Sequence, residues 1–71
     1  MTYEAIVELL DYAGGNDHLV RITTTDDQEV LGIPTTVDTH PTALEVYLRP
    51  LGADDTEIVV RLTQIRTVEM A

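Results

Sequence analysis

The sequence contains no cysteine, serine, lysine, tryptophan or phenylalanine. The absence of cysteine excludes disulfides, thiolate nucleophiles and cysteine-ligated zinc or iron–sulfur sites, and the absence of serine excludes a serine nucleophile. Four arginines stand against thirteen acidic residues, which gives a formal net charge of −9. This charge excludes the usual basic nucleic-acid module, whose cations release counterions from phosphate, and it disfavours binding to anionic membranes.

Long hydrophobic runs are also missing, since no stretch approaches the roughly 18 apolar residues that span a bilayer. The first residues are acidic, unlike a secretory leader, so we expect a cytoplasmic protein. Apolar residues still make up 44% of the 71 residues, which predicts one folded domain over residues 1–71. A core this small contributes only about 3–5 kcal/mol without disulfides or metals, so we expect the chain to form a homo-oligomer.

The only helical periodicity lies at the start of the chain. Tyr3, Ile6, Val7 and Leu10 recur at helical spacing and form one apolar stripe. This spacing predicts a helix over about residues 2–13, with Thr2 as its N-cap. Gly14-Gly15 follows and is expected to stop the helix in the left-handed conformation.

The remaining part of the chain, about residues 17–70, alternates between apolar and polar residues as strands do. We expect strands over residues 18–24, 30–37, 44–49, 56–62 and 66–70, with a single helical turn at 63–65. Gly32 and Pro34 predict a bend or bulge in the second strand. Turn signals recur about every ten residues, which predicts a mainly β fold, a strongly bent, five-stranded antiparallel small β-barrel after the helix.

The order and spacing of these residues resemble the two-part motif of the Sm and like-Sm proteins. The first part of the motif is carried by residues 26–32 and by Val37-Asp38, and the second part by residues 60–65. Asp38-Thr39-His40 lies between them, as in archaeal members of the family. Asp27 and Leu62 replace two glycines of the motif, and Thr42 replaces an asparagine. The resemblance implies an N-terminal helix followed by a five-stranded barrel with a bent second strand.

The resemblance also implies a homo-oligomeric ring of about five to eight subunits, in which the fourth strand of one copy pairs with the fifth strand of the next. The chain gives a separate physical reason for this assembly, because two short apolar strands would otherwise leave exposed sheet edges. The residues expected at this interface are Ile58, Val59, Val60, Val68 and Met70.

In the family, single-stranded RNA binds around the lumen of the ring. Carried over by position, His40 and Arg61 would stack on bases and Asp38 would orient them. Thr42 stands where an asparagine selects uracil, and a hydroxyl cannot match the paired donor and acceptor of an amide. We therefore expect weak binding of U-rich RNA. The plainer alternatives are a solvated His40, an Arg61 paired with a carboxylate, and an Asp38 that caps its own turn.

No enzymatic activity, cofactor or metal is expected. His18 and His40 lack metal-ligand spacing. Asp26-Asp27 and Asp54-Asp55 lie in polar turns, where solvation is the simplest role, and a weak divalent-ion site at Asp54-Asp55 is the alternative. The second functional hypothesis is an acidic interaction module, similar to a Rho-binding antiterminator. Its acidic surface would bind a basic protein partner instead of RNA.

Overall fold

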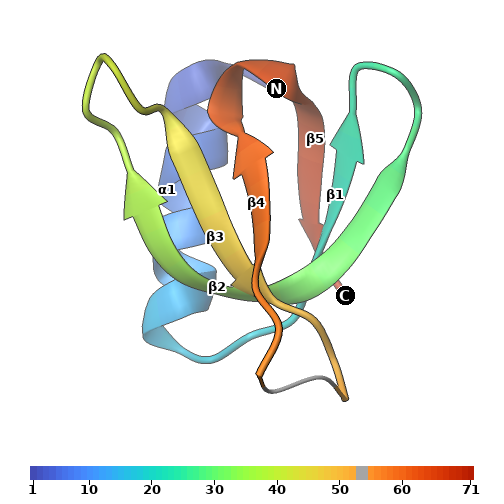
Figure 1. The fold of residues 1–71 in the computed structure, drawn as a ribbon. Helices are drawn as coiled ribbons and strands as arrows, with labels where there is room; N and C mark the ends of the chain where they lie inside the picture. The colour runs from blue at the N-terminus through green and yellow to red at the C-terminus, as the bar shows by residue number, and fades with distance from the viewer. Residues whose placement is uncertain (53–54) are drawn as a thin grey trace.

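The computed structural model describes residues 1–52 and 55–71. It consists of one helix followed by five antiparallel strands, as Figure 1 shows. The elements are α1 (Tyr3–Gly15), β1 (Val20–Thr24), β2 (Glu29–Asp38), β3 (Glu45–Arg49), β4 (Ile58–Arg61), the 3-10 turn η1 (Leu62–Gln64) and β5 (Ile65–Met70). The predicted order of one helix and five strands is confirmed.

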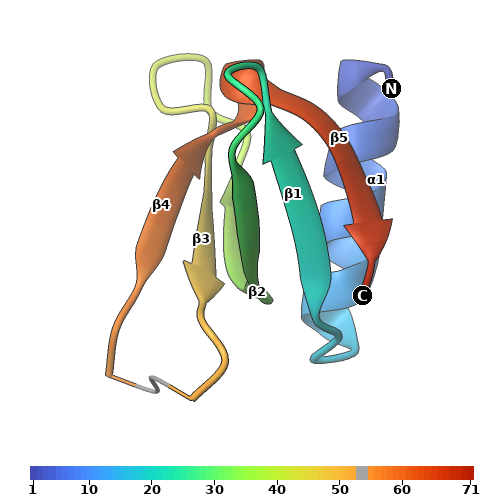
Figure 2. The ribbon, with the colours of Figure 1, turned by 90° about the vertical axis from the view of Figure 1, so that its right-hand side faces the viewer.

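The strands form one continuous sheet in the order β4-β3-β2-β1-β5, with every neighbouring pair antiparallel. β4 and β5 therefore lie at the two edges, and within the described residues they do not pair with each other. Figure 2 shows them on opposite sides of the molecule. The sheet is bent toward a barrel, as the sequence predicts, but the barrel is not closed.

The bend lies in β2, which is shared between two halves of the sheet. Its first part pairs with β1 up to Gly32, and its second part pairs with β3 from Ile33 onward. A Cβ placed on Gly32 would lie 3.1 Å from the Cβ of Leu48 and 3.1 Å from a backbone oxygen of β3. The register shifts between Pro34 and Thr36, which marks a bulge. The predicted roles of Gly32 and Pro34 are confirmed.

The helix α1 packs against β2 and β5 with its apolar face. The Oγ1 of Thr2 accepts a hydrogen bond from the backbone N–H of Ala5 at 3.1 Å, so the predicted N-cap is confirmed. Ile6 and Leu10 are buried, but Tyr3 is 43% exposed and contributes little to the apolar stripe.

The predicted helix end is wrong, because α1 continues through Gly14 and Gly15. Asn16 is the C-cap, and Asp17, with φ of 50°, takes the left-handed conformation instead of a glycine. A Cβ on Gly14 would lie only 3.2 Å from the backbone oxygen of Pro34. The missing side chain of Gly14 thus serves the close packing of α1 on β2, not the end of the helix.

The core lies between α1 and the inner face of the sheet. Within the described residues no polar or charged side chain is buried, so the core is held by apolar packing, at about 25 cal/mol per Å² removed from water. Its members are Ile6, Leu10, Ala13, Val20, Ile22, Val46, Leu48, Val60, Leu62, Ile65 and Val68. In the described part of the chain, no helix has the length and apolar character needed to cross a membrane.

Candidate RNA-binding loop and sheet edges

The loop between β2 and β3 carries three of the four residues expected to bind RNA. Asp38 lies at the end of β2, and its Oδ1 accepts a hydrogen bond from the backbone N–H of His40 at 3.0 Å. This contact closes an Asx turn. Asp38 therefore acts on the backbone of His40, which is the capping alternative that the sequence left open.

The imidazole of His40 is held by its own turn. Its Nδ1 lies 2.8 Å from the Oγ1 of Thr42 and accepts the backbone N–H of Thr42 at 3.3 Å. The tautomer that carries the proton on Nε2 satisfies both contacts. The carbonyl of His40 also accepts the backbone N–H groups of Ala43 and Leu44, at 2.9 and 3.1 Å. The ring is thus oriented before any ligand binds, while the residue stays exposed.

Arg61, the fourth expected residue, ends β4 at the same end of the sheet as this loop (Figure 2). A hydrogen bond of 2.8 Å from the N–H of Leu62 to the carbonyl of Leu44 joins the two segments. Among residues 1–52 and 55–71, the Arg61 guanidinium forms no ion pair and makes no hydrogen bond to His40. The fold brings the four residues to one end of the sheet, and within the described residues no hydrogen bond or ion pair joins Arg61 to the other three.

Two other arginines form ion pairs with carboxylates. The guanidinium of Arg21 lies 3.6 Å from Glu29 and 3.1 Å from Glu69, on neighbouring strands. Arg66 pairs with Asp27 in the β1–β2 turn. All these groups are substantially exposed, so each pair contributes at most about 1 kcal/mol to stability. Arg61 forms no such pair with any residue that the structure describes, which leaves its charge available to a ligand.

The outward face of β3 carries a cluster that sequence reasoning missed. Tyr47 lies opposite Val59 of β4, and Glu45 lies two residues before Tyr47 on the same face. The negative charge of Glu45 raises the pKa of Tyr47, with smaller contributions from burial, Asp38 and Glu57. The alternation in β3 is the sequence signal for Glu45, whereas the approach of Asp38 and Glu57 depends on the sheet.

The acidic pair in the β1–β2 turn has local structural roles. The hydroxyl of Thr24 donates a hydrogen bond to the carboxylate of Asp26, and this bond lowers the pKa of Asp26. Asp27 has a φ of 65° and pairs with Arg66. In the described part of the chain, no group of three metal-ligating side chains is present. Asp54 lies outside the described residues, so the proposed ion site at Asp54-Asp55 is not addressed by the structure.

Among the residues that the structure describes, no strand pairs with the outer edge of β4. The N–H of Leu62 bonds to Leu44, so Val60 and Ile58, two and four residues earlier, also direct their backbone groups toward β3. The backbone groups of Val59 and Arg61 consequently face away from the sheet. The same alternation governs β5, where the N–H of Ala71 bonds to the carbonyl of Leu19 at 3.0 Å.

The side chains of the five expected interface residues differ in exposure. Val60 and Val68 are buried in the core of the single chain, and Ile58 and Met70 are half-buried. Only Val59 is truly exposed, at 48%. These residues can therefore meet another chain mainly through their backbones, with the side chain of Val59 as the exposed apolar contact.

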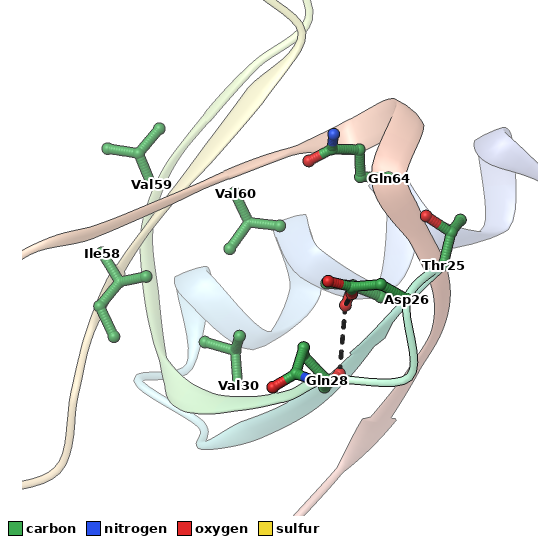
Figure 3. A pocket seen from close by; sticks show the side chains of 9 residues that line it. Thr25, Asp26, Gln28, Val30, Ile58, Val59, Val60 and Gln64 are labelled. Atoms are coloured by element: carbon green, nitrogen blue, oxygen red, sulfur yellow. Dashed lines mark hydrogen bonds between the residues drawn. The ribbon is translucent and has the colours of Figure 1, made fainter.

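A hollow of about 360 Å³ lies where the sheet is open, between β4 and the β1–β2 turn (Figure 3). Its apolar wall consists of Val30 and of residues 58–60, and its polar wall of Gln64 and residues of the turn. A hydrogen bond of 2.8 Å from the N–H of Thr25 to the carbonyl of Gln64 joins the turn to η1. Within the described residues, the outer side of β4 borders this hollow and has no neighbouring strand.

Comparison with known proteins gives this chain no family. No protein-family model matches the sequence, and the comparison with curated proteins found no match.

Proposed function

We propose that this chain is a self-assembling Sm-like module, in which the β4 edge of one copy pairs with the β5 edge of the next. The observation that carries the proposal is that β4 and β5 end one small, bent sheet, and that in the described part of the chain neither has a strand on its outer side. The two edges are different surfaces, so each contact is head-to-tail, and such contacts close into a ring when the rotation per subunit permits. The family resemblance suggests about five to eight copies.

Pairing of the edges would stabilise the chain through new backbone hydrogen bonds and through burial of apolar surface. Each backbone hydrogen bond formed between copies contributes roughly 0.5–1.5 kcal/mol net. The exposed side chain of Val59 and the hollow beside β4 would gain apolar neighbours. An uncovered edge strand otherwise invites uncontrolled aggregation, which a closed ring prevents.

We further propose that the β2–β3 loop and Arg61 bind single-stranded, U-rich RNA weakly. Two observations favour this second function: the His40 ring is already oriented by Thr42, and the Arg61 charge is free of a carboxylate among the described residues. Base stacking on such groups contributes about 1–3 kcal/mol per base. The net charge of −9 on every copy opposes phosphate, so the binding is expected to be weak.

The alternative function is an acidic module for a basic protein partner. The feature that favours it is the carboxylate cluster of Glu45, Asp38 and Glu57 around Tyr47 on the outer face of the sheet. A basic segment would find opposite charge and an aromatic ring there.

The assembly is tested by light scattering on three proteins: wild type, Val59→Pro and Val59→Thr. Proline removes only the N–H that faces away from β3, a position where edge strands tolerate it, and threonine keeps that N–H. We expect wild type and Val59→Thr to form one oligomer of defined mass, and Val59→Pro to be monomeric with unchanged circular dichroism. A wild-type chain that stays monomeric at high concentration contradicts the proposed assembly.

RNA binding is tested by titration of wild type and three further variants with fluorescent oligo-U. Substitution of His40→Ala or Arg61→Ala is expected to weaken binding by roughly 5- to 150-fold, the loss of one stacking group. Arg21→Ala is the charge-matched control, because Arg21 is already paired with Glu29 and Glu69. An intact oligomer that binds no oligo-U at any salt concentration, but retains a polybasic peptide, supports the acidic-module alternative.

A further inference from the structure

The outer edge of β5 is covered by a side chain from the start of the chain. The N–H of Ala71 bonds to the carbonyl of Leu19, directly before β1, so the backbone groups of Val68, three residues earlier, point to the opposite side, away from the sheet. The N–H of Val68 donates a hydrogen bond to the Sδ of Met1, with a nitrogen–sulfur distance of 3.2 Å. Met1 thus occupies a backbone donor on the edge that the proposed assembly would use.

Met1 also lines a groove between α1 and β5. This groove, of about 520 Å³, is mainly apolar, and its other lining residues are Ala5, Glu8, Leu9, Tyr12 and Met70. The half-buried Met70 continues the inner face of β5 into the groove. The side chain of Met1 therefore covers both the free donor of Val68 and part of the apolar surface beside it.

The contact made by Met1 is easily displaced. A thioether sulfur is a weaker acceptor than a backbone carbonyl, and the methionine side chain has three rotatable bonds. Met1 is 56% exposed, so its departure disturbs little of the core. A carbonyl of an added strand would replace the sulfur with a better acceptor at the same N–H.

A second copy of this chain is the occupant that fits the edge. Its β4 has an unpaired outer edge of its own at Val59, and its core-side face carries Ile58 and Val60. The core-side face of β5 carries Val68 and Met70, so apolar faces would continue across the contact. The free donors of one edge would meet the free acceptors of the other.

We propose that Met1 is a displaceable cover on the β5 edge, which the β4 strand of a second copy removes when it pairs with Val68. This inference rests on the proposed assembly and adds a regulatory contact to it. The cover protects the edge of the isolated chain from indiscriminate strand pairing, and its removal sets part of the energetic cost of assembly.

The cover is tested by following the two methionine methyl groups by NMR, which is practical because the chain has only Met1 and Met70. In dilute, monomeric protein we expect nuclear Overhauser contacts between the Met1 methyl and Val68. These contacts should disappear as the oligomer forms at higher concentration. Their absence in the monomer, or their persistence in the oligomer, would overturn the proposal.

Substitutions of Met1 measure how strongly its side chain competes with strand pairing at the β5 edge. Wild type, Met1→Ala and Met1→Leu are released from the same cleavable N-terminal fusion, so that all three carry identical preceding residues. Without a side chain to displace, Met1→Ala should assemble with a dissociation constant about two- to fivefold lower, whereas Met1→Leu, which still covers the groove, should lie between it and wild type. An unchanged or raised dissociation constant for Met1→Ala overturns the proposal.

The two proposals fail in different ways. If no variant assembles, the proposed assembly is wrong, and displacement by a second copy is wrong with it. If the oligomer forms but Met1 does not affect it, the assembly stands and only the cover is rejected.

Discussion

Tyr47 shows how the position of a side chain on a bent sheet sets its electrostatic surroundings. Its neighbours Glu45, Asp38 and Glu57 come from three strands or loops and concentrate negative charge around one phenol. Ionisation of Tyr47 would add a further negative charge, so the folded chain favours the neutral phenol. No single segment of the sequence contains this cluster.

We predict that Glu45→Gln lowers the pKa of Tyr47 toward its usual value of about 10. Glu45 is the largest cause of the upward shift, so its loss should be seen by ultraviolet titration of tyrosinate. Glu8→Gln on α1 is the matched control. An unshifted titration in Glu45→Gln contradicts the assigned cause.

The sign of the effect on stability follows from linkage. The folded-state pKa of Tyr47 is raised, so the unfolded chain loses this proton first. The contribution of neutral Tyr47 to the free energy of unfolding is fully present below its pKa in the unfolded chain, about 10. It is lost as the pH rises through its pKa in the folded chain. Unfolding experiments should therefore show a steeper loss of stability above about pH 10 in wild type than in Glu45→Gln.

The glycines of α1 and β2 have different structural roles. Gly15 ends the helix, and a Cβ placed there meets nothing within 4 Å. Gly32 lies at the bend of β2, where a Cβ would crowd both Leu48 and a backbone oxygen of β3 at 3.1 Å. Position 15 can therefore accept alanine without a close contact, whereas alanine at position 32 requires its neighbours to shift.

We predict opposite effects for Gly15→Ala and Gly32→Ala in urea unfolding. Gly15→Ala should stabilise by about 0.5–1 kcal/mol, because alanine is the better helix former. Gly32→Ala should destabilise by about 1–3 kcal/mol, because β3 must shift to admit the methyl group. Equal effects of the two substitutions would show that the close approach of β3 to Gly32 does not exclude a larger side chain at this position.

The whole molecule is dominated by its excess of negative charge. Thirteen acidic residues face four arginines, and two of those arginines, Arg21 and Arg66, are already paired with carboxylates. The remaining carboxylates repel one another across a surface whose principal-axis extents are only 29 × 24 × 19 Å. This repulsion disfavours both the compact chain and the association of copies.

We predict that sodium chloride stabilises this protein. Raising the ionic strength from 0.1 to 1 M shortens the Debye length from about 10 to about 3 Å and screens the repulsion. A gain of about 1 kcal/mol corresponds to a rise in Tm of roughly 4–8 °C for a domain of this size. The monomeric Val59→Pro variant is the control for salt-driven association. A fall in Tm with salt would show that the ion pairs outweigh the repulsion.

The residue pattern was sufficient to predict the helix, the number of strands and the bend in β2. These features depend on local properties: the helical spacing of Ile6 and Leu10, strand alternation, and the effects of Gly32 and Pro34 on a strand. The end of α1 was not predictable in this way, because Gly14 lies inside the helix. Its missing side chain allows the close approach of Pro34, which belongs to a strand distant in the sequence. Asp38, His40 and Thr42 were expected at one site only because the resemblance to the Sm motif assigns them by position, and hydrogen bonds within one turn join all three.

The sequence alone determined the total charge, the absence of thiol and serine chemistry, and the composition of an apolar core from aliphatic residues. Only the tertiary structure decided which arginines are paired, that β4 and β5 remain at open edges, and that Met1 lies against Val68. The physical reason is the separation along the chain of the residues on which each feature depends. Composition and periodicity are fixed by covalent neighbours, whereas ion pairs, sheet edges and covers depend on segments that meet only after the chain has folded.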